Sequence, residues 1–194
     1  YYQDFENLEE VPFGVNYLIS GGNAWVVGNA TGLPSSEEED TEATSLYISN
    51  TNGTTFNYDE YDLSHAYVSM PITFGDDAEY IISFDYKVVG EGNWDYLSVV
   101  LVNPDSMVTS GQPTGIVLLD KAHDVEEWTT FIYSSSSLSN TTKNLVFYWK
   151  NDGGGGTNPP AAVDDIEVST PCTATAAISV GSPTTTSAVI TRTS

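Results

Sequence analysis

The chain contains 194 residues, of which 27 are acidic, five are lysine or arginine and one is cysteine, and its formal net charge is −22. Because so few cations cannot neutralise a phosphate backbone, we exclude nucleic-acid binding. The single cysteine excludes a disulfide framework and a cysteine-based zinc site. No apolar run approaches the roughly 20 residues that cross a bilayer, so we predict no membrane insertion. A composition rich in Ser, Thr, Asn and Gly favours a secreted or cell-surface protein.

Short strands with a period of two are predicted along most of the chain. The pattern is clearest at residues 80–88, where every second residue from Tyr80 to Val88 is apolar, as in a half-buried antiparallel strand. In chain order, further strands are predicted at 45–49, 66–72, 96–102, 115–119, 128–133, 144–150 and 162–168. Since no segment keeps a helical period, we predict an all-β fold, namely a jelly-roll β-sandwich of antiparallel strands.

Glycine, asparagine and proline mark the predicted connections. Residues 90–93 separate the strands 80–88 and 96–102, which we therefore predict to pair as a hairpin. Residues 151–160 contain four consecutive glycines and two prolines, and they are predicted to form a mobile loop before the last strand. The acidic run at 37–40 is interpreted as a solvated loop rather than a metal site.

A change in composition near residue 171 divides the chain. Residues 1–170 are predicted to form the sandwich, and residues 171–194 a linker and the truncated start of a second β-module. This tail has two β-prone runs around a polar turn and resembles the first two strands of a fibronectin type III-like module. Because two strands alone do not form a stable sheet, they either dock on the sandwich or begin a longer module, and we favour the second.

The residues give little support for catalysis. His65 and His123 lack the spacing of a zinc site and no nucleophile elbow accompanies them, so both are interpreted as exposed loop residues. A pair of carboxylates could hydrolyse a glycoside, but among 27 acids some pairs lie close by chance. We therefore predict a non-enzymatic protein, with a jelly-roll hydrolase as the least favoured alternative.

Two acidic positions interrupt strand-like sequence. One is Asp4–Asn7 near the N-terminus, and the other is the adjacent pair Asp164 and Asp165 in the last predicted strand. Neighbouring residues of a strand point to opposite faces, so one of these aspartates must point inward or sideways. An inward carboxylate needs a partner, and with so few lysines a calcium ion is a candidate counter-charge. Alternatively, both aspartates lie solvated at a sheet edge.

Trp94 differs from the other aromatic residues in its surroundings. Trp25, Phe84, Tyr86 and Phe147 are interpreted as core residues, whereas Trp94 lies in the turn between two predicted strands. An exposed ring beside acids and asparagine could stack on a sugar. It could also fold back as a lid over the sandwich.

The order of these segments resembles a known family. The relevant segments are Asp4-Phe5-Glu6, Trp25, SLYIS (45–49), AYVSMPI (66–72), YIISFDYK (80–87), DYLSVVLV (95–102), Trp128, LVFYW (145–149) and AAVDDIEV (161–168). Together they are similar to the jelly-roll adhesin domains of bacterial surface proteins, of the cleaved-adhesin or choice-of-anchor J type found in the haemagglutinin regions of gingipains. The MAM domain is a more distant relative.

This resemblance implies a secreted or cell-surface adhesin-type binding domain whose partner is an extracellular protein or glycan. It also implies structural calcium where the first and last strands meet, with Glu6 and Asp164 or Asp165 as leading ligands and Asn23 and Asp95 as weaker candidates. The chain lacks the paired cysteines of MAM domains and the acidic loop of some adhesin relatives, so a second calcium site has no evident counterpart. The alternative function is a carbohydrate-binding module of a polysaccharide-degrading enzyme, and an exposed Trp94 would serve that function.

Overall fold

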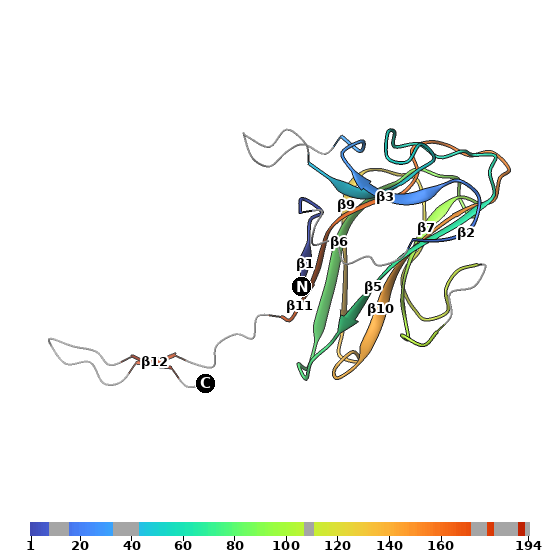
Figure 1. The fold of residues 1–194 in the computed structure, drawn as a ribbon. Coiled ribbons are helices and arrows are strands. Elements are labelled where there is room, and N and C mark those ends of the chain that lie inside the picture. The colour runs from blue at the N-terminus through green and yellow to red at the C-terminus, as the bar shows by residue number, and fades with distance from the viewer. Residues whose placement is uncertain (8–15, 33–42, 107–110, 172–177, 181–189, 193–194) are drawn as a thin grey trace.

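A computed structural model describes residues 1–7, 16–32, 43–106, 111–171, 178–180 and 190–192. The acidic run at 37–40 therefore lies outside the described residues. Within these ranges, no helix has the length and apolarity needed to span a bilayer. The body consists of two antiparallel β-sheets that face each other as layers (Figure 1). This arrangement confirms the prediction of an all-β sandwich.

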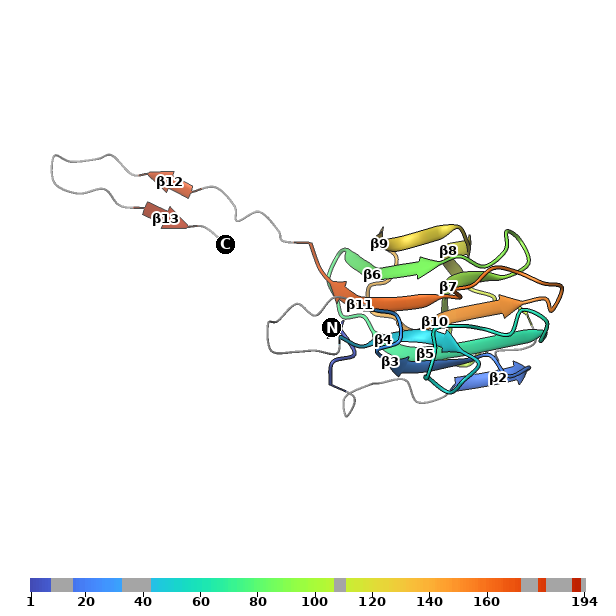
Figure 2. The same cartoon turned by 90° about the horizontal axis from the view of Figure 1, so that it is seen from above.

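Each sheet is built from strands that are distant in the sequence. Sheet A has the order β3 (Ala24–Gly28), β4 (Ser45–Ser49), β11 (Ala162–Ser169), β6 (Tyr80–Val88) and β9 (Val125–Ser135), with β1 (Tyr2–Gln3) paired to β11. Sheet B has the order β2 (Asn16–Ser20), β5 (Ser64–Thr73), β10 (Thr142–Asn151), β7 (Tyr96–Val102) and β8 (Ile116–Ala122). All neighbours pair antiparallel, and in Figures 1 and 2 the N-terminal end lies beside β11.

The core lies between the facing sides of the two sheets. Strand β6 alternates strictly between buried and half-buried residues, as its period of two predicts. Phe147 of sheet B is the centre of the contact, because its ring lies 5.4 Å from that of Phe84 and 6.5 Å from that of Trp25, both in sheet A. Burial of these side chains stabilises the sandwich by removing apolar surface from water. The core positions predicted from the sequence, Tyr86 among them, are confirmed.

The predicted hairpin of residues 80–88 and 96–102 is wrong. Strand β6 pairs with β11 and β9 in sheet A, whereas β7 pairs with β10 and β8 in sheet B. Residues 89–95 are long enough to cross the roughly 10 Å between packed sheets, so the turn residues fit a crossing as well as a hairpin. Gly90 has a φ of +60°, and a side chain there would collide with the carbonyl of Asp95. The glycine thus serves the crossing between the layers.

Residues 152–161 join β10 to β11, as predicted, but hydrogen bonds fasten this loop to the loop before β5. The Asn158 side-chain oxygen accepts from the Tyr58 amide at 2.9 Å, and the Asn158 amide group donates to Glu60 at 2.7 Å. A Cβ on Gly153 would lie 2.9 Å from the amide nitrogen of Leu63, so the glycine permits this close approach. The expectation of a mobile loop overlooked these contacts between distant segments.

The C-terminal tail contributes two short strands. Strands β12 (Ile178–Val180) and β13 (Ile190–Arg192) pair antiparallel in a two-stranded sheet of their own. Their pairing agrees with two β-prone runs around a turn. The assignment of residues 171–194 to the start of a second module stays a prediction.

Candidate functional site

The two aspartates of the last body strand point to different environments. Asp164 is only 7% exposed, whereas Asp165 lies at the surface. The register between β11 and β6 shifts between Asp164 and Glu167, which marks a β-bulge. Within the bulge, Asp165 has a φ of +48°. Thus one aspartate is turned inward, as the sequence predicts.

The carboxyl of Asp164 is buried without a cation. Its Oδ1 accepts a hydrogen bond from the Asp165 amide at 2.8 Å. The pKa of Asp164 is raised to about 8, mainly by burial and additionally by the nearby charges of Asp165, Glu6 and Asp4, while the hydrogen bond from the Asp165 amide acts in the opposite direction. In the described part of the chain, the one ion pair is between His123 and Asp124. Asp164 therefore favours either a proton or a bound cation.

The N-terminal segment brings more carboxylates to the same end of sheet A. Strand β1 pairs with β11, so that Gln3 lies opposite Ile166, and the Tyr2 hydroxyl donates to Asp165. After β1 the chain turns: Asp4 accepts from the Glu6 amide at 3.2 Å, and Glu6 accepts from the Thr44 amide at 2.9 Å. The predicted ligands Glu6, Asp164 and Asp165 thus come from two segments that lie side by side.

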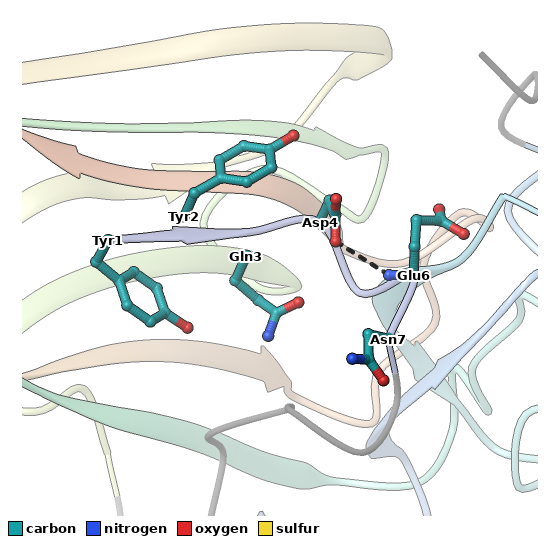
Figure 3. A pocket seen from close by; sticks show the side chains of 6 residues that line it. All are labelled: Tyr1, Tyr2, Gln3, Asp4, Glu6 and Asn7. Atoms are coloured by element: carbon teal, nitrogen blue, oxygen red, sulfur yellow. Dashed lines mark hydrogen bonds between the residues drawn. The ribbon is translucent and has the colours of Figure 1, made fainter. Parts of the chain in front are cut away.

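A pocket of about 450 Å³ opens beside β1. Figure 3 shows Tyr1 and Gln3 on one side of the strand and Tyr2 on the other. The pocket is lined by Tyr1, Tyr2, Gln3, Asp4, Glu6 and Asn7. Asp164, whose pKa is raised, is not among the lining residues. The structure therefore does not place it in this pocket, as an acid catalyst for a bound substrate would require.

The fit to a metal ion is partial. In the described ranges, no three or more Asp, Glu, His or Cys side chains are grouped so that they could hold a metal. Calcium takes six to eight oxygen ligands, and backbone carbonyls, amide oxygens and water supply many of them in proteins. An ion at Asp164 would therefore rest on one or two carboxylates, completed by such neutral oxygens.

Asn23 and Asp95 have their partners elsewhere. Asn23 is buried, accepts from the Asp59 amide at 2.7 Å and donates to the Ser64 hydroxyl at 2.6 Å. Asp95 is fully buried and accepts from the Tyr58 hydroxyl at 2.7 Å and the Asp152 amide at 3.0 Å. These contacts lie in the loop before β5, at the first residue of β5 and in the loop after β10, not on β1 or β11. Both side chains thus fasten loops, a role that sequence spacing alone did not indicate.

Trp94 is the most exposed tryptophan among the described residues. Its side chain is 55% exposed, whereas Trp25 and Trp149 are buried and Trp128 is half-buried. The Lys150 Nζ lies 5.5 Å from the centre of the Trp94 ring and 5.5 Å from that of Tyr96. The Lys121 Nζ lies 5.6 Å from the centre of the same Tyr96 ring. We call Trp94, Tyr96, Lys121 and Lys150 the Trp94 surface, in which Tyr96 is itself only 6% exposed. A lid role for Trp94 is not supported, because more than half of its side chain is open.

An aromatic cluster supports this surface on the side of sheet B that faces away from the core. The rings of Tyr67 and Tyr148 stack with centres 4.8 Å apart, and Tyr96 meets Tyr148 edge-on at 6.1 Å. The Tyr148 hydroxyl is 2.7 Å from the His65 Nδ1. His65 lies in β5 and is half-buried, so its interpretation as an exposed loop residue is wrong. Burial lowers the pKa of His65, and the charge of Lys150 lowers it further.

Continuous apolar runs in the sequence indicate this cluster. Strand β7 is buried at every position and β10 at most of them. Such continuous apolar runs are typical of strands that are covered on both faces.

No protein-family model matches the sequence, and comparison with curated proteins finds no match. Solved structures do match. The K1 cleaved adhesin domain of Lys-gingipain from Porphyromonas gingivalis W83 has a TM-score of 0.52 and 15% identity, over 87% of this chain and 96% of that domain. The fold is a jelly-roll β-sandwich.

Two further solved structures match with TM-scores below 0.5. The family 11 carbohydrate-binding module from Clostridium thermocellum, solved with a β-1,3-1,4-mixed-linked tetrasaccharide, has a TM-score of 0.44 and 16% identity over 85% of this chain and 93% of that module. The enzymatically active domain of bacteriophage CBA120 tailspike protein 4 has a TM-score of 0.48 and 12% identity over 85% of this chain. The match covers only 20% of the tailspike chain. At these identities and TM-scores the two matches carry no conclusion about this chain.

Proposed function

We propose that this jelly roll is a non-enzymatic binding domain of a secreted or cell-surface protein, of the adhesin type, and that it binds carbohydrate through the Trp94 surface. The observation that carries the proposal is the 55% exposure of Trp94 beside Tyr96 and Lys150. A flat apolar ring next to a few polar groups is what a sugar site requires, because the ring covers the apolar face of a pyranose and the polar groups fix its orientation.

A structural calcium ion is the second part of this proposal. Asp164 would hold it together with Glu6 or Asp165, because the charges of these two carboxylates act on Asp164 and no described lysine forms an ion pair with them. Calcium would supply the positive charge that a buried carboxylate needs. It would also connect strands far apart in the sequence, which stabilises the folded chain against unfolding.

Replacing Trp94 tests the carbohydrate site. We expect Trp94→Ala to weaken binding to an immobilised polysaccharide by about tenfold or more, because a central tryptophan commonly dominates such an interface. The measurement is binding of the wild type and the variant to a panel that includes galactan, xylan and polygalacturonan. Since Trp94 is exposed, the melting temperature should change little.

Trp128→Ala is the matched control. Trp128 lies in β9 of sheet A, and like Trp94 it has a lysine over its ring, with the Lys87 Nζ at 5.0 Å from the centre. The control should bind as the wild type does. If binding is instead lost in Trp128→Ala and kept in Trp94→Ala, the carbohydrate site lies on sheet A and the proposed surface is wrong. If no polysaccharide binds, a protein ligand becomes the better hypothesis.

A further inference from the structure

The lysines of this acidic chain have other partners than its described acids. In the described residues no lysine forms an ion pair with a carboxylate, although the chain has 27 acidic residues. Lys87 donates to the Thr31 carbonyl at 2.8 Å, and Lys143 donates to the Asn103 side chain at 2.5 Å. Lys121 and Lys150 instead meet at the ring of Tyr96. Two ammonium groups therefore lie at one ring, and no described carboxylate is within salt-bridge distance of either.

A β-bulge directs Lys121 to this place. Leu97 pairs with Ala122 and Val99 with Leu119, so Asp120 and Lys121 together oppose the single residue Ser98. Lys121 has a φ of +47°, and its amide donates to the Ser98 hydroxyl at 3.0 Å. A bulge re-aims a side chain, and a positive φ at a residue with a Cβ costs free energy. The strand thus accepts local strain at the residue that brings the second ammonium group to Tyr96.

We infer that the Trp94 surface binds an anionic pyranose, whose ring stacks on Trp94 and whose carboxylate or sulfate group contacts Lys150 and Lys121. This inference rests on the proposed carbohydrate-binding function and specifies its ligand class. Charge-assisted hydrogen bonds from ammonium groups are stronger than bonds between neutral groups. A neutral sugar would leave both lysines without a counter-charge.

The net charge of −22 does not prevent such binding. The Debye length at physiological ionic strength is about 8 Å, so acids scattered over the distant surface are largely screened, whereas ammonium groups in contact with the ligand are not. Burial raises the pKa of Tyr96, and the charge of the nearby Asp120 raises it as well. The Asp120 carboxylate accepts a hydrogen bond from the Gln112 amide group at 3.1 Å. The two ammonium groups at Tyr96 thus attract an anionic ligand in contact with them, although the protein as a whole is negative.

The test compares one polymer with and without its charge. Polygalacturonan and its fully methyl-esterified form share a backbone, and esterification converts each carboxylate to a neutral methyl ester. We expect the 194-residue chain to bind polygalacturonan at least tenfold more tightly than the ester. Lys150→Met keeps most of the apolar stem and should remove most of that preference, and Lys121→Gln should reduce it. A sulfated galactan, compared with the unsulfated polymer, decides whether sulfate can replace carboxylate.

Lys143→Met is the matched control, because Lys143 lies on the same strand as Lys150 but bonds to Asn103 at its other end. It should leave the preference unchanged. Preference for either anionic polymer, lost in the Lys150 variant, supports the inference. Equal binding of the acid and the ester, with loss in Trp94→Ala, would overturn the anionic class while the carbohydrate-binding function stands. Binding of no polymer, or of a protein ligand alone, would overturn both.

Discussion

In EDTA, the free energy of unfolding should fall as the pH rises from about 4 to 8, because Asp164 loses its proton in the folded state only at high pH. The pKa of this buried carboxyl is about 8 in the folded chain, against an ordinary value of 3.8 for aspartate. The folded state therefore holds a proton that the unfolded state releases, so this stability is present below the unfolded pKa and is lost as the pH rises through the folded one. The expected loss is about 2–5 kcal/mol.

Calcium should reverse this loss. At pH 8 the ionised carboxylate can bind the ion, so a few millimolar calcium should raise the melting temperature by several degrees, and by less at pH 5, where a proton competes. Asp164→Asn is neutral at every pH. We expect the variant to be more stable than the wild type at pH 8 in EDTA and to show no calcium response, as measured by thermal melts over pH.

Two further variants make this prediction specific. Asp76→Asn removes an exposed aspartate and should retain both the pH dependence and the calcium response of the wild type. Glu6→Gln should weaken the calcium response while leaving most of the pH dependence, since burial is the main cause of the raised pKa of Asp164. A calcium response in Asp164→Asn equal to that of the wild type would show that calcium does not bind at Asp164.

Asp95→Ala should lower the free energy of unfolding by about 2–4 kcal/mol, and calcium should not change the size of this loss. The carboxylate of Asp95 accepts from the Tyr58 hydroxyl and from the Asp152 amide, and Tyr58 is itself only 3% exposed. Truncation leaves both donors without their acceptor and opens a cavity. Guanidinium unfolding with and without calcium measures the effect.

A double-mutant cycle isolates the contact between Asp95 and Tyr58. Tyr58→Phe removes the donor and should cost about 1 kcal/mol, and the double variant should cost less than the sum of the two single changes, because they break the same hydrogen bond. If Asp95→Ala instead abolishes the calcium response and is otherwise harmless, Asp95 is a metal ligand as the resemblance implied, and its role in fastening the loop is minor.

The sequence by itself determined the class of fold and the strands from residue 45 onward, whereas β1, β2 and β3 were not predicted. Alternation over Tyr80–Val88 predicts a half-buried strand, since successive side chains of a strand point to opposite faces, and the same rule predicts that one of Asp164 and Asp165 is inward. Both predictions needed only neighbours in the chain. The core position of Phe84 followed from the same alternation.

Only the tertiary structure decided which strands pair and which distant side chains meet. The turn before Trp94 looked like a hairpin, but β6 and β7 belong to different sheets, because pairing depends on the burial of both faces and not on turn residues alone. Asp95 accepts a hydrogen bond from Tyr58, and a bulge brings Lys121 to the ring of Tyr96. Both contacts join residues so distant in the sequence that no local pattern predicts them. Local periodicity specifies the direction of a side chain within its strand, whereas its partner is set by the order of the strands in the sheets.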